Sequence, residues 1–273
     1  MLSERSGKNR CDRWTVFEFI LATVVIVAIN NNALKFSPNT LSQTVAEMVL
    51  FSRFLCWSYF LSALSSDYDL SFQVRAVKSY SKIKKTIPDI DAITVAFWIR
   101  TNDTNPGTVI SYASKEGDVV QDNAFALQEY ASFVLFVNNQ TVFTGLRAND
   151  GQWHHVAITW ESAGGTWHAY KDGVETKASS APFQKGQVVN GGGVMILGQD
   201  QDELGGGFNT EENLIGDVSQ MNVFDYVLSA NDIYNLVYSC DYVKGNIAAW
   251  ADFREQLFGE YHVTDKSYAC DCK

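Results

Sequence analysis

Apolar and polar residues alternate in short runs over most of the chain after residue 66. Polar or glycine-containing turns separate these runs, the clearest of which lie at 92–100, 108–113, 133–139 and 154–160. Runs of this length, rich in β-branched and aromatic residues, are typical of strands. They predict an all-β fold in which two antiparallel sheets form a sandwich.

The strand period of two also bears on candidate metal ligands and on a turn. Neighbouring side chains in a strand point to opposite faces, so His154 and His155 cannot chelate one metal ion together. We expect one of them at the surface and the other packed at a strand end. The run at 166–171 leads into Asp172-Gly173, a dipeptide that accepts the positive φ angles of a two-residue hairpin turn, so another strand should follow at once.

A single short helix is predicted at 230–238. Ser229 can cap its first turn, and Asp232 stands three residues further on, as in a capping box. Its apolar stripe would consist of Ile233, Leu236 and Val237. We expect this helix to pack on a sheet, since it carries no residues of evident chemical function.

The first 66 residues differ from the rest because they hold two apolar runs, at 14–29 and 54–64. The first run is short for a bilayer, which asks for roughly 20 apolar residues, and it contains Glu18. The second ends in small residues and predicts signal-peptide cleavage near Ser65, with translation starting at Met48. The alternative is a type II membrane anchor at 14–29, since three basic residues precede that run.

Charge and cysteine content then limit the function classes. The formal net charge is -10, the pI is about 4.8 and no basic run interrupts the body of the chain, which argues against a nucleic-acid partner. Secretion would permit disulfides among Cys240, Cys270 and Cys272, the cysteines after residue 66. It would also permit glycosylation at the sequons of Asn102 and Asn139.

Catalytic motifs do not occur in the sequence. It contains no G-x-S-x-G, no H-E-x-x-H and no phosphate-binding glycine loop with lysine, so we do not expect an enzyme. A glycan-cleaving carboxylate pair, Asp200 with Glu212, is the enzymatic alternative. These acids belong to a glycine-rich stretch, whereas a hydrolase needs them inside a walled cleft.

Residues 197–208 read LGQDQDELGGGF and gather three acids beside three glycines. A solvated turn would tolerate this composition, but a bound cation would cancel the repulsion. In an extended segment Asp200 and Asp202 project to one side together with the Gln201 carbonyl, and calcium prefers such hard oxygens. The glycines would let Asn209, Glu211 and Glu212 return to the acids. A helix-loop-helix calcium loop is set aside because Leu204 occupies a ligand position and the preceding residues form a strand pattern.

The chain resembles the pentraxin family over roughly residues 70–258. The segments that carry this resemblance occur in the family's order, namely AITVAFWIRT, VISYASKEGDVVQDNAFAL, DGQWHHVAITWES, WHAYKDG and ILGQDQDELGGGF…LIGDVSQMNVFDYVLS. The resemblance implies a flattened jelly roll of the concanavalin and laminin-G type, with two calcium ions on one face. With the apolar runs before residue 66, it divides the chain into a leader at 1–66, a pentraxin domain at 67–258 and a cysteine-containing tail at 259–273.

The resemblance also implies a ligand set, from which this chain departs in places. The first-site positions are Asp122, Asn123, Asp200, the Gln201 carbonyl and Asp202. Two second-site positions differ in type, because Asn209 replaces the usual acid and Glu212 the usual glutamine. Affinity for the second ion is therefore expected to differ.

Other departures concern ligand choice and cross-links. Gln128 stands where phosphocholine-binding members carry phenylalanine, so a quaternary ammonium group would lose apolar contact. Ala96 and Ala157 replace the family's paired cysteines and should leave a small apolar contact in the sandwich core. The tail resembles that of neuronal pentraxins and adhesion-receptor modules. Pairing of Cys240 with Cys270 or Cys272 would leave one thiol to join subunits.

Together these observations predict a secreted calcium-dependent binding protein that recognises a surface ligand, as in innate pattern recognition. The ligand would be an anionic head group, a glycan or a protein, and the resemblance suggests a homo-oligomer. The alternative is a laminin-G-like adhesion or matrix module that binds a protein partner.

Overall fold

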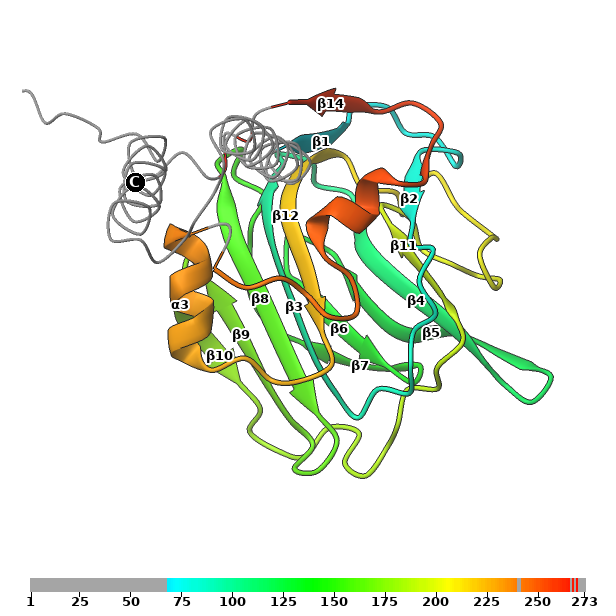
Figure 1. The fold of residues 1–273 in the computed structure, drawn as a ribbon, viewed down its shortest axis with the longest axis vertical. Helices are drawn as coiled ribbons and strands as arrows, with labels where there is room; N and C mark the ends of the chain where they lie inside the picture. Colours follow the sequence, from blue (N-terminus) through cyan, green and yellow to red (C-terminus); the bar gives the residue numbers. More distant parts are fainter. Residues whose placement is uncertain (1–67, 240–241, 266, 268, 270–273) are drawn as a thin grey trace, which may run out of the picture. The chain divides into compact units, whose positions relative to one another are not determined.

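The computed structural model describes residues 68–239, 242–265, 267 and 269. These residues form two seven-stranded sheets whose named strands pair in antiparallel fashion (Figure 1). Sheet A has the order β10 (Val174–Ala178), β9 (Thr166–Lys171), β8 (His154–Glu161), β3 (Ala92–Arg100), β12 (Gly216–Phe224), β1 (Asp69–Phe72) and β14 (His262–Thr264). Sheet B has the order β13 (Leu257–Phe258), β2 (Tyr80–Lys82), β11 (Val194–Leu197), β4 (Thr108–Glu116), β5 (Val119–Gln128), β6 (Val134–Val137) and β7 (Gln140–Phe143). The predicted two-sheet all-β fold is confirmed.

The main core lies between the two sheets and follows the alternation seen in the sequence. On β8, Val156, Ile158 and Trp160 are buried in this core. Facing residues from sheet B, such as Phe125 and Leu135, belong to the same cluster. Burial of large side chains is the main stabilising contribution to such a sandwich, at roughly 1.5–3 kcal/mol for each fully buried aliphatic or aromatic residue.

The predicted helix is present as α3 (Ala230–Tyr238), and Figure 1 shows it in orange beside strands β8 to β10. Its capping box is formed: Ser229 Oγ accepts a hydrogen bond from the Asp232 N–H at 3.2 Å, and Asp232 Oδ2 accepts one from the Ser229 N–H at 3.3 Å. Ile233 and Leu236 are buried against sheet A. A second helical element, the 3-10 helix η1 (Trp250–Arg254), was not predicted.

Ala96 and Ala157 are direct partners in the pairing of β3 with β8. They belong to a small second cluster beneath α3, together with Tyr170, Phe224, Leu228, Ile233 and Leu236. The expectation that this pair lies in the sandwich core was therefore wrong. The alternation correctly separates the two faces of β8, but it cannot say that the outer face is also buried, because the helix that covers it comes about 70 residues later.

The adjacent histidines point apart, as expected. His155 is buried with its ring 5.4 Å from that of Trp98, and burial lowers its pKa to about 4. His154 is half-buried at the other face, with Nδ1 2.9 Å from Asp172 Oδ2 and Nε2 3.0 Å from Asp150 Oδ2. Asp172 has a φ of 53° in the predicted hairpin turn, and β10 begins two residues later at Val174.

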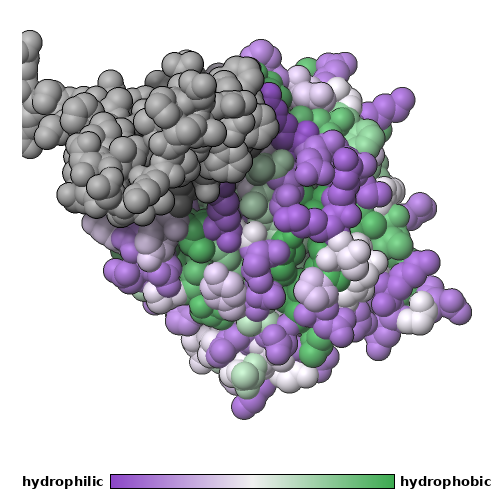
Figure 2. Space-filling view, in the orientation of Figure 1, coloured by the Kyte–Doolittle hydropathy of each residue, from purple (hydrophilic) through white to green (hydrophobic). Residues whose placement is uncertain are grey.

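One lysine, Lys177, joins the edge strands β10 and β7, and a second, Lys171 of β9, contacts the segment after β7. Lys177 Nζ donates a hydrogen bond to the Phe143 carbonyl at 3.0 Å, and Lys171 Nζ donates to the Arg147 carbonyl at 2.8 Å. Phe143 and Val174 on these strands are 63% and 64% exposed. On the face seen in Figure 2, hydrophobic and hydrophilic residues are interspersed.

Candidate functional site

A strand of sheet B and a loop that follows another of its strands supply the sequence-predicted ligands. Asp122 and Asn123 lie within β5, and the others lie in the acidic loop, which we define as residues 198–213 after β11. The pairing of β4 with β5 slips here, because Tyr112 faces Phe125 whereas Ser114 faces Gln121. Residues 122–124 thus oppose one residue of β4. Such a bulge re-aims side chains that a regular ladder would fix.

Asp200 is the central acid of the site. It is only 7% exposed, and Gln128 Nε2 donates a hydrogen bond to its Oδ1 at 2.8 Å. Burial, together with the negative charges of Glu212, Asp202 and Asp122, raises the pKa of Asp200 to about 6, although a hydrogen bond from the Gln201 N–H acts in the opposite direction. Four predicted acids therefore share one neighbourhood.

The Gln201 side chain stabilises the conformation of the loop through hydrogen bonds. It is fully buried, with Nε2 donating to Ser111 Oγ and to the Val194 carbonyl, both at 3.1 Å, while Oε1 accepts from the Gly205 N–H at 2.9 Å. Both ends of the amide are engaged in these bonds. The oxygen that Gln201 could offer a cation is consequently its backbone carbonyl, as the resemblance implies.

Glycines return the acidic loop toward its beginning. Glu203 and Gly206 exchange two backbone hydrogen bonds of 3.2 and 3.1 Å, and Gly207 has a φ of +74°. A Cβ atom at Gly207 would lie 2.7 Å from Asp202 Cβ, so only glycine fits this close approach. The chain reversal expected from the glycines is present.

Asn209 and Glu212 lie after this reversal, and Glu212 approaches Asp202. Burial and the Asp202 charge raise the pKa of Glu212, and a hydrogen bond with the Asn209 side chain lowers it. The Glu212 carbonyl accepts a hydrogen bond from the Thr108 N–H at 2.8 Å, which ties this part of the loop to β4. Glu211 is exposed, and its N–H donates to Asn209 Oδ1 at 3.1 Å.

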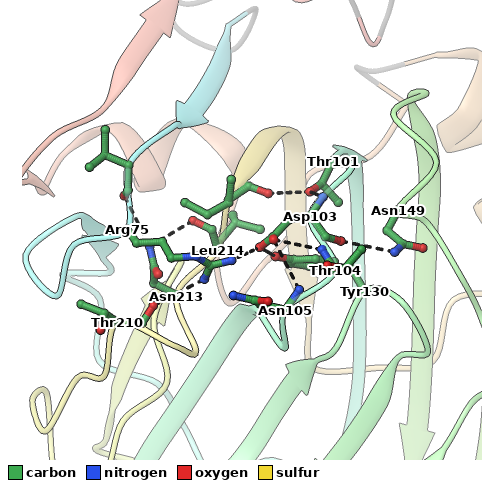
Figure 3. A network of polar contacts seen from close by, with 12 residues as sticks. Arg75, Thr101, Asp103, Thr104, Asn105, Tyr130, Asn149, Thr210, Asn213 and Leu214 are labelled. Atoms are coloured by element: carbon green, nitrogen blue, oxygen red, sulfur yellow. Dashed lines mark hydrogen bonds and ion pairs between the residues drawn. The ribbon is translucent and has the colours of Figure 1, made fainter.

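A polar network holds the acidic loop from the side (Figure 3). Arg75 Nη2 lies 2.5 Å from Asp103 Oδ2, its Nη1 donates to the Thr210 carbonyl at 3.4 Å, and the Tyr130 hydroxyl donates to the same Asp103 oxygen. Burial would raise the pKa of Asp103, but the hydrogen bonds from Tyr130, the Asn105 N–H and Arg75 outweigh it and hold that pKa low. Sequence reasoning missed this network.

The residues fit calcium by type and neighbourhood. They offer carboxylate, amide and carbonyl oxygens, the ligands that this hard cation prefers, and their carboxylates repel one another without it. Among the described residues, no group of three or more His, Cys, Asp or Glu side chains is close enough to hold a metal ion. Amide and backbone oxygens would therefore have to contribute.

Comparison with known proteins identifies the family. The Pentaxin family matches residues 70–265 of this chain. The chain belongs to the pentraxin family. Pentraxins are generally non-enzymatic proteins that bind calcium, so the family does not favour the Asp200 and Glu212 pair as a hydrolytic site.

Several relatives are similar to this pentraxin over its β-sandwich. The chain is 42% identical to the rat (Rattus norvegicus) Sushi, von Willebrand factor type A, EGF and pentraxin domain-containing protein 1, covering 76% of this chain and 6% of that protein. It is 33% identical to human neuronal pentraxin-1, covering 70% of this chain and 44% of that protein. The chain thus spans less than half of these relatives.

A solved structure supports the fold of this pentraxin. The heptameric SAP-like pentraxin from Limulus polyphemus superposes with a TM-score of 0.63 at 24% identity, covering 76% of this chain and 98% of that one. The extracellular region of zebrafish Gpr126/Adgrg6 gives a TM-score of 0.58 at 17% identity, covering 72% and 26%. At these identities the likeness shows the fold alone.

The two sequons of this pentraxin lie in exposed connections between strands. Asn102 is exposed in the segment between β3 and β4. Asn139 is exposed between β6 and β7, where its Oδ1 accepts from the Asn123 N–H at 3.2 Å and its Nδ2 donates to Gln121 Oε1 at 2.8 Å. The second sequon therefore adjoins the candidate site.

Other sequence predictions lie outside the described residues. These are the leader at 1–66, with Met48, Ser65 and the alternative anchor at 14–29, and the cysteines Cys240, Cys270 and Cys272. Within the described ranges, neither α3 nor any other helix has the length and apolarity needed to cross a membrane. Strand β14, within the expected tail at 259–273, pairs with β1.

Proposed function

We propose that this pentraxin is a secreted, calcium-dependent binding protein that recognises a ligand on a surface, in the manner of innate pattern recognition. The observation that carries the proposal is the position of Asp200, which is nearly buried among three other acids. A carboxylate in such surroundings is costly to keep charged unless a cation compensates it.

The residues divide between two ions. Asp122, Asn123, Asp200, the Gln201 carbonyl and Asp202 would hold the first. Asn209 and Glu212 would complete a weaker second site beside Asp202, which Glu212 approaches. Bound calcium would neutralise the acids and offer open coordination positions to oxygen atoms of the ligand.

The chemistry around the site favours an oxygen-rich ligand. Gln128 places a polar amide beside Asp200, so an anionic head group or a glycan hydroxyl suits the site better than a quaternary ammonium group. We also propose a homo-oligomer, by analogy with the heptameric Limulus polyphemus pentraxin. Several weak sites on one assembly would bind a repetitive surface by avidity.

The second candidate is an adhesion or extracellular-matrix module that binds a protein partner. It is favoured by the 42% identity to one part of a relative whose name combines sushi, von Willebrand factor type A and EGF domains with pentraxin. A calcium-dependent array of head groups, glycans and extracellular proteins separates the two. Binding restricted to proteins would favour the module.

Calorimetric titration with calcium tests the site itself. Replacing Asp202 by Asn should weaken both ions, whereas Glu212→Gln should weaken the second alone. Glu203→Gln is the matched control, since it removes an exposed acid from the same loop and should leave binding unchanged. The proposal fails if wild-type protein takes up no calcium at millimolar concentration and protease cuts the acidic loop equally with and without chelator.

A further inference from the structure

Gln128 occupies a position that its strand fixes from both sides. It is the last residue of β5 and pairs with Thr108 of β4 and with Val134 of β6. Its backbone therefore cannot shift without disturbing sheet B. The half-buried side chain extends from this fixed point toward the acidic loop.

The Gln128 amide contacts one candidate ligand in each of the two segments. Its Nε2 donates to Asp200 Oδ1 at 2.8 Å and lies 3.4 Å from Asn123 Oδ1. Asp200 and Asn123 are 77 residues apart in the chain, and the amide bridges them across the site. These two oxygens are also proposed ligands of the first calcium ion.

An amide group in this position offsets part of the charge that a cation would neutralise. Its N–H bonds carry partial positive charge, and a hydrogen bond to a charged acceptor is stronger than one between neutral groups. Calcium needs the same oxygen lone pairs, so the ion and the amide compete. An apolar side chain at 128 would leave the oxygens of Asp200 and Asn123 open to the ion.

We propose that Gln128 is a placeholder for calcium. In the calcium-free protein its amide occupies the oxygens of Asp200 and Asn123, stabilises that state and thereby sets the affinity of the site for calcium. The inference rests on the proposed function, since it concerns the same two oxygens. When calcium enters, the amide leaves Asp200 and Asn123. Because of Gln128, the site of this pentraxin would fill at a higher calcium concentration than its calcium ligands alone would require.

If Gln128 were instead a calcium ligand, its loss would change the calcium affinity in the opposite direction. If the amide instead rotated on calcium binding and presented Oε1, Gln128 would be a ligand and its loss would weaken binding. A placeholder and a ligand therefore differ in the sign of the affinity change. They differ as well in whether the calcium-free protein loses stability.

The experiment compares full-length wild type with Gln128→Leu, which removes the donor and approximately keeps the volume. We expect a lower Tm in chelator and a calcium Kd that is tighter by roughly tenfold, the worth of one hydrogen bond to a charged acceptor. The control is Gln73→Leu, because the Gln73 amide lies 3.4 Å from Asp217 of sheet A, outside the candidate site. This control should leave the calcium Kd unchanged.

The outcomes separate the two proposals. If wild type binds calcium and Gln128→Leu binds equally or more weakly, the placeholder is wrong and the proposed function stands. If neither protein binds calcium, the proposed function fails and the placeholder fails with it. Measurable binding by wild type together with tighter binding by Gln128→Leu supports the placeholder.

Discussion

Two regions of this pentraxin are held together by opposite means. The cluster beneath α3 consists of apolar side chains, with Ala96 facing Ala157 where the family's disulfide would stand. The acidic loop depends on polar contacts, with the nearly buried Asp200 held by the Gln128 amide. The stability of a buried apolar cluster does not require a bound cation, whereas the stability of a group of neighbouring carboxylates does. We therefore expect the helix cluster to be equally stable with and without calcium, and the loop to gain stability when calcium binds.

The largest expected effect comes from removing apolar contact beneath the helix. Ile233 is fully buried between α3 and sheet A, so Ile233→Ala should cost about 2–5 kcal/mol. Urea denaturation should give the same loss with calcium and with chelator. A loss that appeared only in chelator would mean that the cluster and the loop are coupled.

Calcium removal is expected to have the next largest effect, and to act on the other region. At a hundredfold excess over Kd, a bound ion stabilises the folded state by about 2.7 kcal/mol. Chelation should lower the Tm and speed hydrogen exchange in the acidic loop before it affects α3. Equal acceleration in both regions would contradict the contrast drawn between them.

Restoring the missing cross-link should sharpen the contrast. Ala96 and Ala157 are direct partners across antiparallel strands, so the double substitution Ala96→Cys and Ala157→Cys places two thiols within bonding reach. We expect the oxidised variant to gain at most about 2 kcal/mol, as engineered bridges often give less than theory. Its gain over the reduced form should not depend on calcium, which thermal unfolding with and without reductant would show.

The smallest effect concerns acid and the network that holds the loop. The folded-state pKa of Asp103 is depressed, so its contribution is present above the unfolded pKa and is lost as pH falls through the folded value. Asp103→Asn should cost about 1 kcal/mol near neutral pH and should flatten the loss of stability in acid. Denaturation curves at neutral and acid pH measure this. An unchanged acid slope in the variant would assign the pH dependence to other carboxyl groups.

The fold could be predicted from sequence to the extent that it follows local rules. Alternation marks β3 and β8, Asp172-Gly173 marks the hairpin before β10, and Ser229 marks the start of α3. The 3-10 helix η1 was missed because its Trp250 is fixed by stacking on Tyr68, with ring centroids 4.4 Å apart across 182 residues. No spacing within η1 signals that partner.

The site shows the same division. The acids and glycines of the acidic loop could be read from the sequence, because their composition is local. The bridge from Gln128 to Asp200 and the Arg75 contact with Asp103 could not, since they join residues 72 and 28 positions apart. Sequence reasoning noticed Gln128 only as an absent apolar contact and gave no hint that its amide reaches a predicted ligand.

The Lys177 contact between β10 and β7 has a consequence for how copies of the protein behave at high concentration. A strand at the margin of a sheet can pair with a strand of another molecule through its unpaired peptide groups. Burial of the exposed Phe143 and Val174 side chains would stabilise such pairing. Lys177 occupies the Phe143 carbonyl and brings a charge to this margin. Replacement of Lys177 by methionine would therefore be expected to make these strands a site at which aggregation begins.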